Sequence, residues 1–399
     1  METFDIYPVR IENQDQARKF LKDIGASHQG IDIMAPKCQH FALKVGPLSP
    51  QAAQIMKQEL LSRGGETATN TGVLVGKEGS YVMLIGTLAQ FRRLLPKLRM
   101  QPFGLPRLSG ELEEVIANLS VPVEKRPLLD GKKGVLIGER TLVMGILNVT
   151  PDSFSDGGIF ADPERAVDRG LEMEEQGADI IDVGGESTRP GHEPIDAGEE
   201  LSRLLPVLER LASSLKAPIS VDTYKARVAE AALEAGVDII NDVSGLADPD
   251  MARVVARHGV PLIIMHNQPE DSPDIMQGII RSLKEKKQQA VEAGVEPGRI
   301  ILDPGIGFHK DREQNLEVLN RLDALKCLGQ PILLGTSRKS VIGKTLDLPV
   351  EERLEGTAAT VAVGVLRGAH IVRVHDVREM VRVVRMTDAV VKVGRSSHG

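Results

Sequence analysis

Polar and charged side chains follow a series of short apolar runs in the second part of this chain. In chain order they are Asn148; Asp182 with Glu186; Asp222; Asn241; His266; Asp303; Ser337 with Lys339; and Arg373 with His375. Any one of them is equally well explained as a loop residue or a helix cap, and Asp222 could cap a helix beginning at Tyr224. Because all eight runs end this way, we favour a shared site over eight unrelated loop residues.

Three of these residues, Asp222, Asn241 and Asp303, offer hydrogen-bond acceptors. A carboxylate can accept two parallel N–H bonds, so two carboxylates near an amide suit a flat heterocycle with an aminopyrimidine edge. Metal binding by the two aspartates is the alternative, but no His-rich or closely spaced acidic set supports a tight cage. These residues predict a site for an N–H-rich heterocycle.

A second group, Lys339, Arg373 and His375, is cationic or able to become so. Arg373 and His375 are two residues apart, so on a strand they face the same side. A phosphate is the natural partner for such a pair. The alternative for Arg373 is a buried ion pair with a nearby aspartate, and we favour the anion site.

Asn148 is neutral and could lend one oxygen to a magnesium ion that takes its other ligands from water and phosphate. No Ser-His-Asp set or cysteine nucleophile stands out. A group transfer in which diphosphate leaves is therefore more consistent with these residues than hydrolysis through a covalent intermediate.

The elements that must position these residues are strands alternating with helices. The apolar runs are Leu142–Leu147, Asp179–Val183, Ile219–Val221, Asp238–Ile240, Pro261–Met265, Arg299–Leu302, Pro331–Leu334 and His370–Val374. Asp162-Pro163 and Asp248-Pro249 are expected to begin helices, and glycines to end them before the next strand: Gly177, Gly236, Gly259, Gly294 and Gly368. Eight such units predict a (β/α)8 TIM barrel, in which the carboxyl ends of the strands meet at one rim. A doubly wound open sheet is the alternative, but its Gly-rich dinucleotide fingerprint is missing.

Residues 1–120 predict a separate, small mixed α/β domain. We expect strands at His40–Leu48 and Ser80–Thr87 and helices at Ser49–Gly65, Leu88–Met100 (interrupted by Pro96) and Leu112–Leu119. Residues 121–134 are rich in Pro, Gly and charge, which indicates a linker, and residues 135–399 form the barrel domain. Gly138-Glu139-Arg140 is expected to turn a hairpin between the apolar runs on either side of it.

Composition narrows the class of protein. The 399 residues carry a formal net charge of -7, which argues against a general nucleic-acid binder. Cys38 and Cys327 lack metal or redox spacing, so we expect two reduced thiols rather than a disulfide. The N-terminus has no signal-like apolar core and no run reaches membrane-spanning length, so we expect a cytoplasmic protein without a membrane partner.

Seven segments together resemble the dihydropteroate synthase family of folate biosynthesis. They are Met144–Gly158, Asp182–Gly191, Ser220–Lys225, Ile240–Gly245, Asp303–Phe308, Gly335–Gly343 and Arg373–Val377, in the family's order. The resemblance covers Val135 to about Val393 and says nothing firm about the first 120 residues. It implies that p-aminobenzoate displaces diphosphate from 6-hydroxymethyl-7,8-dihydropterin diphosphate, with Mg2+ as cofactor.

The resemblance also implies roles for individual residues. It places the pterin on Asp222, Asn241, Asp303, Lys339 and Met265. It places the diphosphate near Asn148, Arg189, Arg373 and His375, with magnesium on Asn148, and p-aminobenzoate among Thr188, Arg189, Pro190, Phe308 and Ser337. Lys339, Arg373, His375 and Asn148 are the implied catalytic residues.

Some features depart from the family or follow it only by analogy. A glycine is common in the family at the position of His309, and Met265–Gln268 keeps only its first two residues. Val149–Gly158 and Ser187–Gly191 are expected to act as lids over p-aminobenzoate. A homodimer through Glu351–Arg367 is expected by analogy.

Two other functions compete with the synthase. A methyltetrahydrofolate-dependent corrinoid methyltransferase would share the pterin acceptors but has no use for a diphosphate clamp. A non-catalytic pterin-binding protein would not need both the anion and the aminobenzoate motifs.

Overall fold

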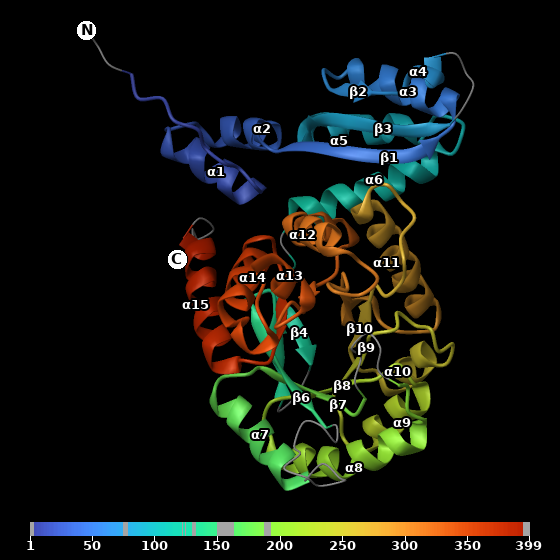
Figure 1. Cartoon of the computed structure of the whole chain (residues 1–399). Helices are drawn as coiled ribbons and strands as arrows, with labels where there is room; N and C mark the ends of the chain where they lie inside the picture. Colours follow the sequence, from blue (N-terminus) through green and yellow to red (C-terminus); the bar gives the residue numbers. More distant parts are fainter. Residues whose placement is uncertain are drawn as a thin grey trace. The chain divides into compact units, whose positions relative to one another are not determined.

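The computed structural model describes residues 4–74, 79–121, 123, 125–129, 133–149, 163–186 and 193–393 (Figure 1). The chain divides into two compact units. One consists of Met1–Pro122 with the end of the chain from Lys392, and the other is Val123–Val391. No described helix is long and apolar enough to cross a membrane. Cys38 and Cys327 are both free thiols, as expected.

The first unit is built on a three-stranded antiparallel sheet. Its strands are β1 (His40–Leu48), β2 (Glu66–Ala68) and β3 (Ser80–Thr87), in the order β1-β3-β2. Its helices are α1 (Gln14–Asp23), α2 (His28–Cys38), α3 (Pro50–Leu61), α4 (Thr71–Leu74), α5 (Leu88–Leu98) and α6 (Leu105–Ser120).

The strands expected at β1 and β3 and the helices expected at α3, α5 and α6 are confirmed. Ser49 caps α3 by accepting the N–H of Ala52. Pro96 does not end α5, which continues to Leu98. Helices α1, α2 and α4 and strand β2 were not predicted from the sequence. Helix α6 begins seven residues earlier than expected, at Leu105 instead of Leu112.

Two short strands precede the barrel and correct two expectations. Arg126–Leu129, placed in a linker, forms β4, which pairs antiparallel with β5 (Val135–Ile137). Gly138-Glu139-Arg140 therefore does not turn a hairpin between its flanking apolar runs. The run after it, β6 (Leu142–Asn148), pairs instead with the barrel strands β7 and β13. It is apolar on both faces, and a parallel barrel sheet buries both faces of its strands.

Eight strands, all paired in parallel, form the expected (β/α)8 barrel (Figure 1). After β6 they are β7 (Ile180–Gly184), β8 (Ile219–Asp222), β9 (Ile239–Asp242), β10 (Leu262–Met265), β11 (Ile300–Asp303), β12 (Leu333–Leu334) and β13 (Ile371–Val374). They follow the order β11-β10-β9-β8-β7-β6-β13-β12, and a bridge between Leu302 and Ile332 joins the two ends of the sheet.

Helices cover the outside of the barrel. They are α7 (Pro163–Glu175), α8 (Ala197–Ser214), α9 (Ala226–Glu234), α10 (Met251–His258), α11 (Ile275–Glu292), α12 (Arg312–Asn320), α13 (Ser340–Leu346), α14 (Leu354–Leu366) and α15 (Val377–Val393), with 3-10 turns η3 (Pro297–Arg299), η4 (Leu322–Leu328) and η5 (Val350–Glu352). The five glycines expected to end helices all have a left-handed φ, which only glycine adopts without strain.

One expected helix start is wrong. Asp248 does not cap α10, whose N-cap residue is Asp250, and the Asp250 side chain makes no capping hydrogen bond. Asp248 accepts hydrogen bonds from the backbone N–H groups of Ala226, at the start of α9, and of Asp250.

The inner face of the barrel carries two kinds of side chain, one above the other. At the amino end the inward residues are apolar and pack with Leu128 of β4 and Ile137 of β5; they are Leu142, Met144, Ile180, Ile239, Ile263, Ile301, Leu333 and Ile371. Side chains two residues further along a strand share its face. Asp182, Asn241, Met265, Asp303 and Arg373 each stand two residues after one of these apolar residues. The packed base of the barrel therefore supports the polar rim.

Candidate active site

Arg373 connects two aspartates inside the barrel. Its Nε donates to Oδ2 of Asp182 at 2.6 Å, and its Nη2 donates to Oδ2 of Asp222 at 2.7 Å. An anion was the favoured partner of Arg373 on sequence grounds, but in this structure Arg373 makes the alternative, an ion pair with nearby aspartates. The second oxygens of both aspartates, Oδ1, are buried and have no hydrogen-bond partner within the described part of the chain.

Asn241 joins this cluster through the same aspartate. Its Nδ2 donates to Oδ2 of Asp182 at 3.2 Å, and both side chains are buried. The cluster thus brings together Asp222, Asn241 and Arg373, which were predicted to bind substrate, and Asp182, which was expected only as one of the polar residues that follow the strands. Asp222 is not a helix cap, because α9 begins only at Ala226, whose N–H is accepted by Asp248.

Burial sets the protonation of the two acceptor carboxylates. It raises the pKa of Asp222 to about 7, although the nearby Arg373 guanidinium acts in the opposite direction. Burial also raises the pKa of Asp303, against the effect of Lys339. Both carboxylates are thus shielded from water, and Oδ1 of Asp222 also has no hydrogen-bond partner among the described residues, so this oxygen can accept an N–H group from a ligand.

Asp303 and Lys339 form the other side of the rim. Oδ1 of Asp303 accepts the N–H of Gly305 at 2.7 Å, which fixes the start of the loop after β11. Nζ of Lys339 donates to the carbonyl of Ile306 at 2.5 Å and lies 4.7 Å from the centre of the Phe308 ring. Burial lowers the pKa of Lys339 to about 8.

Two more predicted pairs lie at the ends of neighbouring strands. Met265 is buried beside Asp303, its register partner on β11. Oγ of Ser337 accepts the backbone N–H of His375 at 3.1 Å and lies 3.0 Å from Nδ1 of the same ring. Ser337 therefore fixes the position of His375.

Asn148 ends β6 opposite Gly184, its register partner on β7. A Cβ on Gly184 would lie 3.7 Å from Oδ1 of Asn148 and 3.8 Å from Cβ of Asp222, so glycine keeps this space open. Among the described residues no group of three His, Cys, Asp or Glu could hold a metal. A single amide oxygen is chemically compatible with a hard divalent ion such as Mg2+, which keeps most of its ligands from water and phosphate.

Three predicted residues, Thr188, Arg189 and Pro190, lie outside the described residues. The same holds for the Ser187–Gly191 lid and for the other lid after Val149.

Sequence reasoning missed Lys310. Its Nζ contacts Nδ1 of His266 and the carbonyls of Gly305 and Phe308, at 3.0, 3.0 and 3.1 Å. On the other side, Nε2 of His266 lies 2.9 Å from Oε1 of Glu270. The sequence identified His266 as the polar residue after β10, but the spacing along the chain does not show that Lys310 is its partner.

The backbone at the neighbouring His309 shows why a glycine is common at this position in the family that the sequence resembles. Its φ is 47°, in the left-handed region that favours glycine. A glycine suits this position, and the histidine there adopts a strained backbone while its side chain is exposed.

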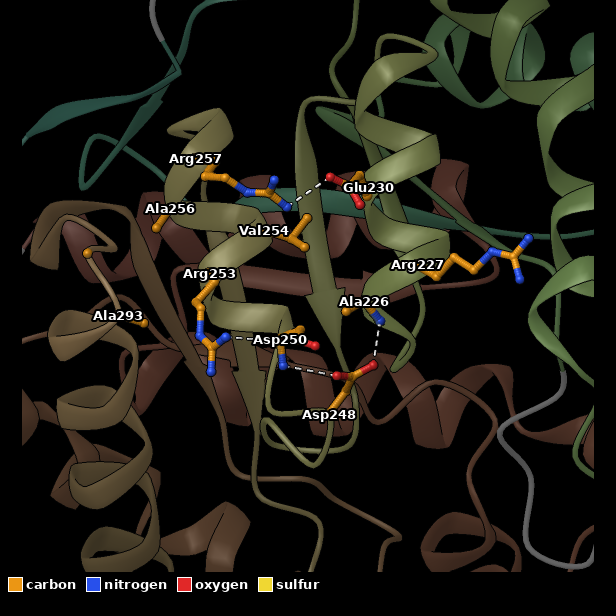
Figure 2. Close-up of a pocket in the computed structure, with 11 residues that line it drawn as sticks. Ala226, Arg227, Glu230, Asp248, Asp250, Arg253, Val254, Ala256, Arg257 and Ala293 are labelled. Carbon is orange, nitrogen blue, oxygen red and sulfur yellow. Dashed lines mark hydrogen bonds and ion pairs between the residues drawn. The ribbon is translucent and has the colours of Figure 1, made fainter.

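A surface hollow of about 760 Å3 lies between α9 and α10 (Figure 2). Residues of α9 and α10 line most of it, and two ion pairs lie within it, between Arg257 and Glu230 and between Arg253 and Asp250. None of the predicted site residues lines this hollow, so it is not the candidate active site.

Comparisons with known proteins agree with the fold and the rim. The pterin binding enzyme family matches residues 144–375. A dihydropteroate synthase from Bacillus subtilis is 54% identical over 263 residues, which cover 65% of this chain and 92% of that protein. The chain therefore belongs to the family of pterin-binding enzymes. Within that family its relatives are the dihydropteroate synthases, transferases of folate biosynthesis.

Two further relatives add detail. A dihydropteroate synthase from Xanthomonas albilineans, solved with 4-aminobenzoic acid, matches with a TM-score of 0.64 and 41% identity, over 67% of this chain and 98% of that one. A probable bifunctional folylpolyglutamate synthase/dihydropteroate synthase from Halobacterium salinarum is 43% identical over 390 residues. That match covers 95% of this chain and 46% of the relative, so it includes residues of the first unit.

Proposed function

We propose that this chain condenses 6-hydroxymethyl-7,8-dihydropterin diphosphate with p-aminobenzoate to give 7,8-dihydropteroate and diphosphate. The observation that carries the proposal is the buried cluster of Asp182, Asp222, Asn241 and Arg373, with unsatisfied carboxylate oxygens beside a fixed cation. A methyltransferase or a pure pterin binder would need the acceptors but not the cations.

The pterin end of the site consists of acceptors. Oδ1 of Asp222, which is buried and has no partner among the described residues, accepts N–H groups of the aminopyrimidine edge, together with Asn241 and Asp303. Lys339 donates to the ring system, and Met265 packs against its face. The gain on binding is expected to be largest at Asp222, because its buried Oδ1 has no hydrogen-bond partner among the described residues until the pterin supplies one.

The diphosphate end consists of cations and one amide. Arg373 and His375 donate to the diphosphate together with Arg189, and Asn148 would hold the magnesium ion. Bound there, Mg2+ would stabilise charge on the departing diphosphate as a Lewis acid. Ser337 keeps the ring of His375 in place because its Oγ lies 3.0 Å from Nδ1 of that ring.

The chemical step is a substitution with dissociative character. The bond between the exocyclic methylene carbon and the diphosphate oxygen breaks, and its electron pair leaves with the diphosphate. Arg373 and His375 stabilise that charge. The amino nitrogen of p-aminobenzoate forms the new bond to carbon and loses a proton to solvent. An aromatic amine is nucleophilic enough that the site needs no strong general base.

The p-aminobenzoate subsite is proposed among Thr188, Arg189, Pro190, Phe308 and Ser337. Phe308 supports this assignment because its ring lies beside Lys339, at the border with the pterin end. The amine would therefore arrive next to the methylene carbon that it attacks.

We also propose, from the family, that the protein acts in the cytoplasm as a homodimer that uses α14. Val363 and Leu366 of α14 are 38% and 54% exposed, which fits an apolar contact with a second copy.

Binding of the pterin ester to the Asp222→Ala variant tests the proposal. Calorimetry should detect binding to the wild-type chain and none to this variant. Asp248→Ala, which removes an aspartate of the surface hollow, is the control and should bind normally. Equal affinity of Asp222→Ala and the wild type would contradict the pterin assignment.

A further inference from the structure

Asp182 is a buried carboxylate that makes no contact with substrate in the proposed function. Its relative exposure is 0%, and its Oδ2 accepts from Nε of Arg373 at 2.6 Å and from Nδ2 of Asn241 at 3.2 Å. The three residues come from β7, β13 and β9. Neither β9 nor β13 neighbours β7 in the strand order, so both contacts cross the inside of the barrel.

The contact with Asn241 fixes the orientation of an amide. A carboxylate accepts hydrogen bonds but cannot donate them. Nδ2 of Asn241 must therefore face Asp182, and the carbonyl oxygen of the amide must point away from it. Asn241 thus presents an acceptor to the pterin. Without a carboxylate at position 182, either face of the amide could be presented.

The contact between Asp182 and Arg373 holds the guanidinium group at its Nε. Asp182 binds Nε, whereas the outer nitrogen Nη2 binds Asp222. When pterin N–H groups occupy Asp222, the outer edge of the guanidinium can pass to the diphosphate. Asp182 meanwhile holds the side chain in place.

We infer that Asp182 is a positioning residue that couples the two ends of the substrate site. It orients Asn241 as an acceptor for the pterin and holds Arg373 for the diphosphate. This inference deepens the proposed function and rests on it.

The variant Asp182→Asn tests the inference with little change of volume. The new amide can donate to Oδ1 of Asn241 and turn its amide, so that an N–H group faces the pterin. We expect affinity for 6-hydroxymethylpterin, which has no diphosphate, to fall about tenfold, as for one mismatched buried hydrogen bond. We expect kcat to fall about 100-fold because Arg373 also loses its anchoring charge.

The exchange variant Asp182→Asn with Asn241→Asp separates the two effects. Its residue 241 is again an acceptor for the pterin, so affinity for 6-hydroxymethylpterin should return to within about threefold of wild type. Its kcat should stay low, since position 182 still lacks the charge that holds Arg373. A purely structural role would not restore binding without restoring turnover.

Ser220→Ala is the matched control. Ser220 is the register partner of Asp182 on β8, and its buried Oγ has no hydrogen-bond partner in the described chain. Its removal should leave both affinity and kcat unchanged. If Asp182→Asn does not fold, as judged by thermal unfolding, Asp182→Ser provides the same measurements.

Three outcomes are decisive. If Asp182→Asn matches Ser220→Ala in affinity and kcat, the inference is wrong. If the exchange variant does not recover pterin affinity, the orientation of Asn241 is not set by Asp182. A wild-type protein that binds no pterin overturns the proposed function and, with it, the role of Asp182.

Discussion

Nη2 of Arg373 lies 2.7 Å from Oδ2 of Asp222, so the proposed diphosphate cation and the proposed pterin acceptor are bound to each other. Each neutralises the other inside the barrel. The site without substrate thus avoids an isolated buried charge, which would cost several kcal/mol. Substrate must replace this contact with hydrogen bonds of its own at both residues.

Replacement of Arg373 should therefore separate binding from turnover. In Arg373→Ala, Asp222 loses the cation that opposes the rise of its pKa, so its carboxyl should hold its proton to higher pH than in the wild type. Pterin should therefore still bind to this variant, with an affinity that recovers as the pH is raised. The kcat should fall by about 100- to 1,000-fold because the leaving diphosphate loses a cation. Steady-state kinetics together with calorimetry on 6-hydroxymethylpterin would check this. Arg257→Ala, in the surface hollow, is the control. Retention of full kcat in Arg373→Ala would show that Arg373 does not stabilise the leaving diphosphate.

Pterin binding should weaken at acidic pH. The pKa of Asp222 is raised to about 7 by burial, so below pH 7 its carboxyl carries a proton and accepts N–H bonds poorly. Affinity for 6-hydroxymethylpterin at pH 6 should be about tenfold lower than at pH 8. Calorimetry across this range measures how the affinity depends on pH, and Asp222→Asn should abolish this dependence. A pH dependence that persists in that variant would belong to another group, such as Asp303.

The raised pKa of Asp222 also determines how the stability of the folded protein changes with pH. The folded protein binds the Asp222 proton more tightly than the unfolded chain, whose pKa is near 3.8. The contribution of Asp222 to the free energy of unfolding should therefore decrease as the pH rises from about 4 through 7. Urea unfolding of the wild type and Asp222→Asn across this range would measure that difference.

Removal of Lys310 should affect p-aminobenzoate more than pterin. Its ammonium group holds the carbonyls of Gly305 and Phe308, and therefore the loop that carries the Phe308 ring. In Lys310→Met the KM for p-aminobenzoate should rise about tenfold, while the Kd for pterin changes less. Lys287→Met is the control, because Lys287 also binds a carbonyl, that of Leu328, but belongs to α11. Equal effects on both substrates would contradict this role for the loop.

The position of a truncation should decide whether the barrel folds. Leu128 of β4 packs with the apolar base of the barrel, so a chain that begins at Val123 keeps this cover. A chain that begins at Lys133 loses Leu128 and leaves β5 without its partner strand. Burial of one leucine is worth about 2–5 kcal/mol, so the shorter chain should unfold at clearly lower urea concentration. The account fails here if both chains are equally stable.

Much of the fold was readable because local patterns determined it. The runs apolar on both faces became barrel strands, and glycines such as Gly177 and Gly259 ended helices where only a left-handed φ fits. The β4 strand was not predictable, because Arg126–Leu129 is short, contains a proline and gains its stability from Leu128 under the barrel. Tertiary packing, not the local sequence, makes it a strand.

The site was predictable in its membership but not in its connections. A polar residue at each strand end identified Asp222, Asn241, Asp303, Lys339 and Arg373. Which of them touch depends on the stagger of strands across the barrel, which no spacing along the chain encodes. For this reason the ion pair of Arg373 and the shared oxygen of Asp182 emerged only in three dimensions.

The central claim is that this chain joins p-aminobenzoate to a pterin with loss of diphosphate. Release of diphosphate from 6-hydroxymethyl-7,8-dihydropterin diphosphate, measured with Mg2+ in the presence and absence of p-aminobenzoate, tests it most directly. The account predicts that diphosphate and 7,8-dihydropteroate form in equal amounts when p-aminobenzoate is present, and that both are lost when a chelator removes Mg2+. Binding of both substrates by the wild-type chain with neither product formed would contradict it.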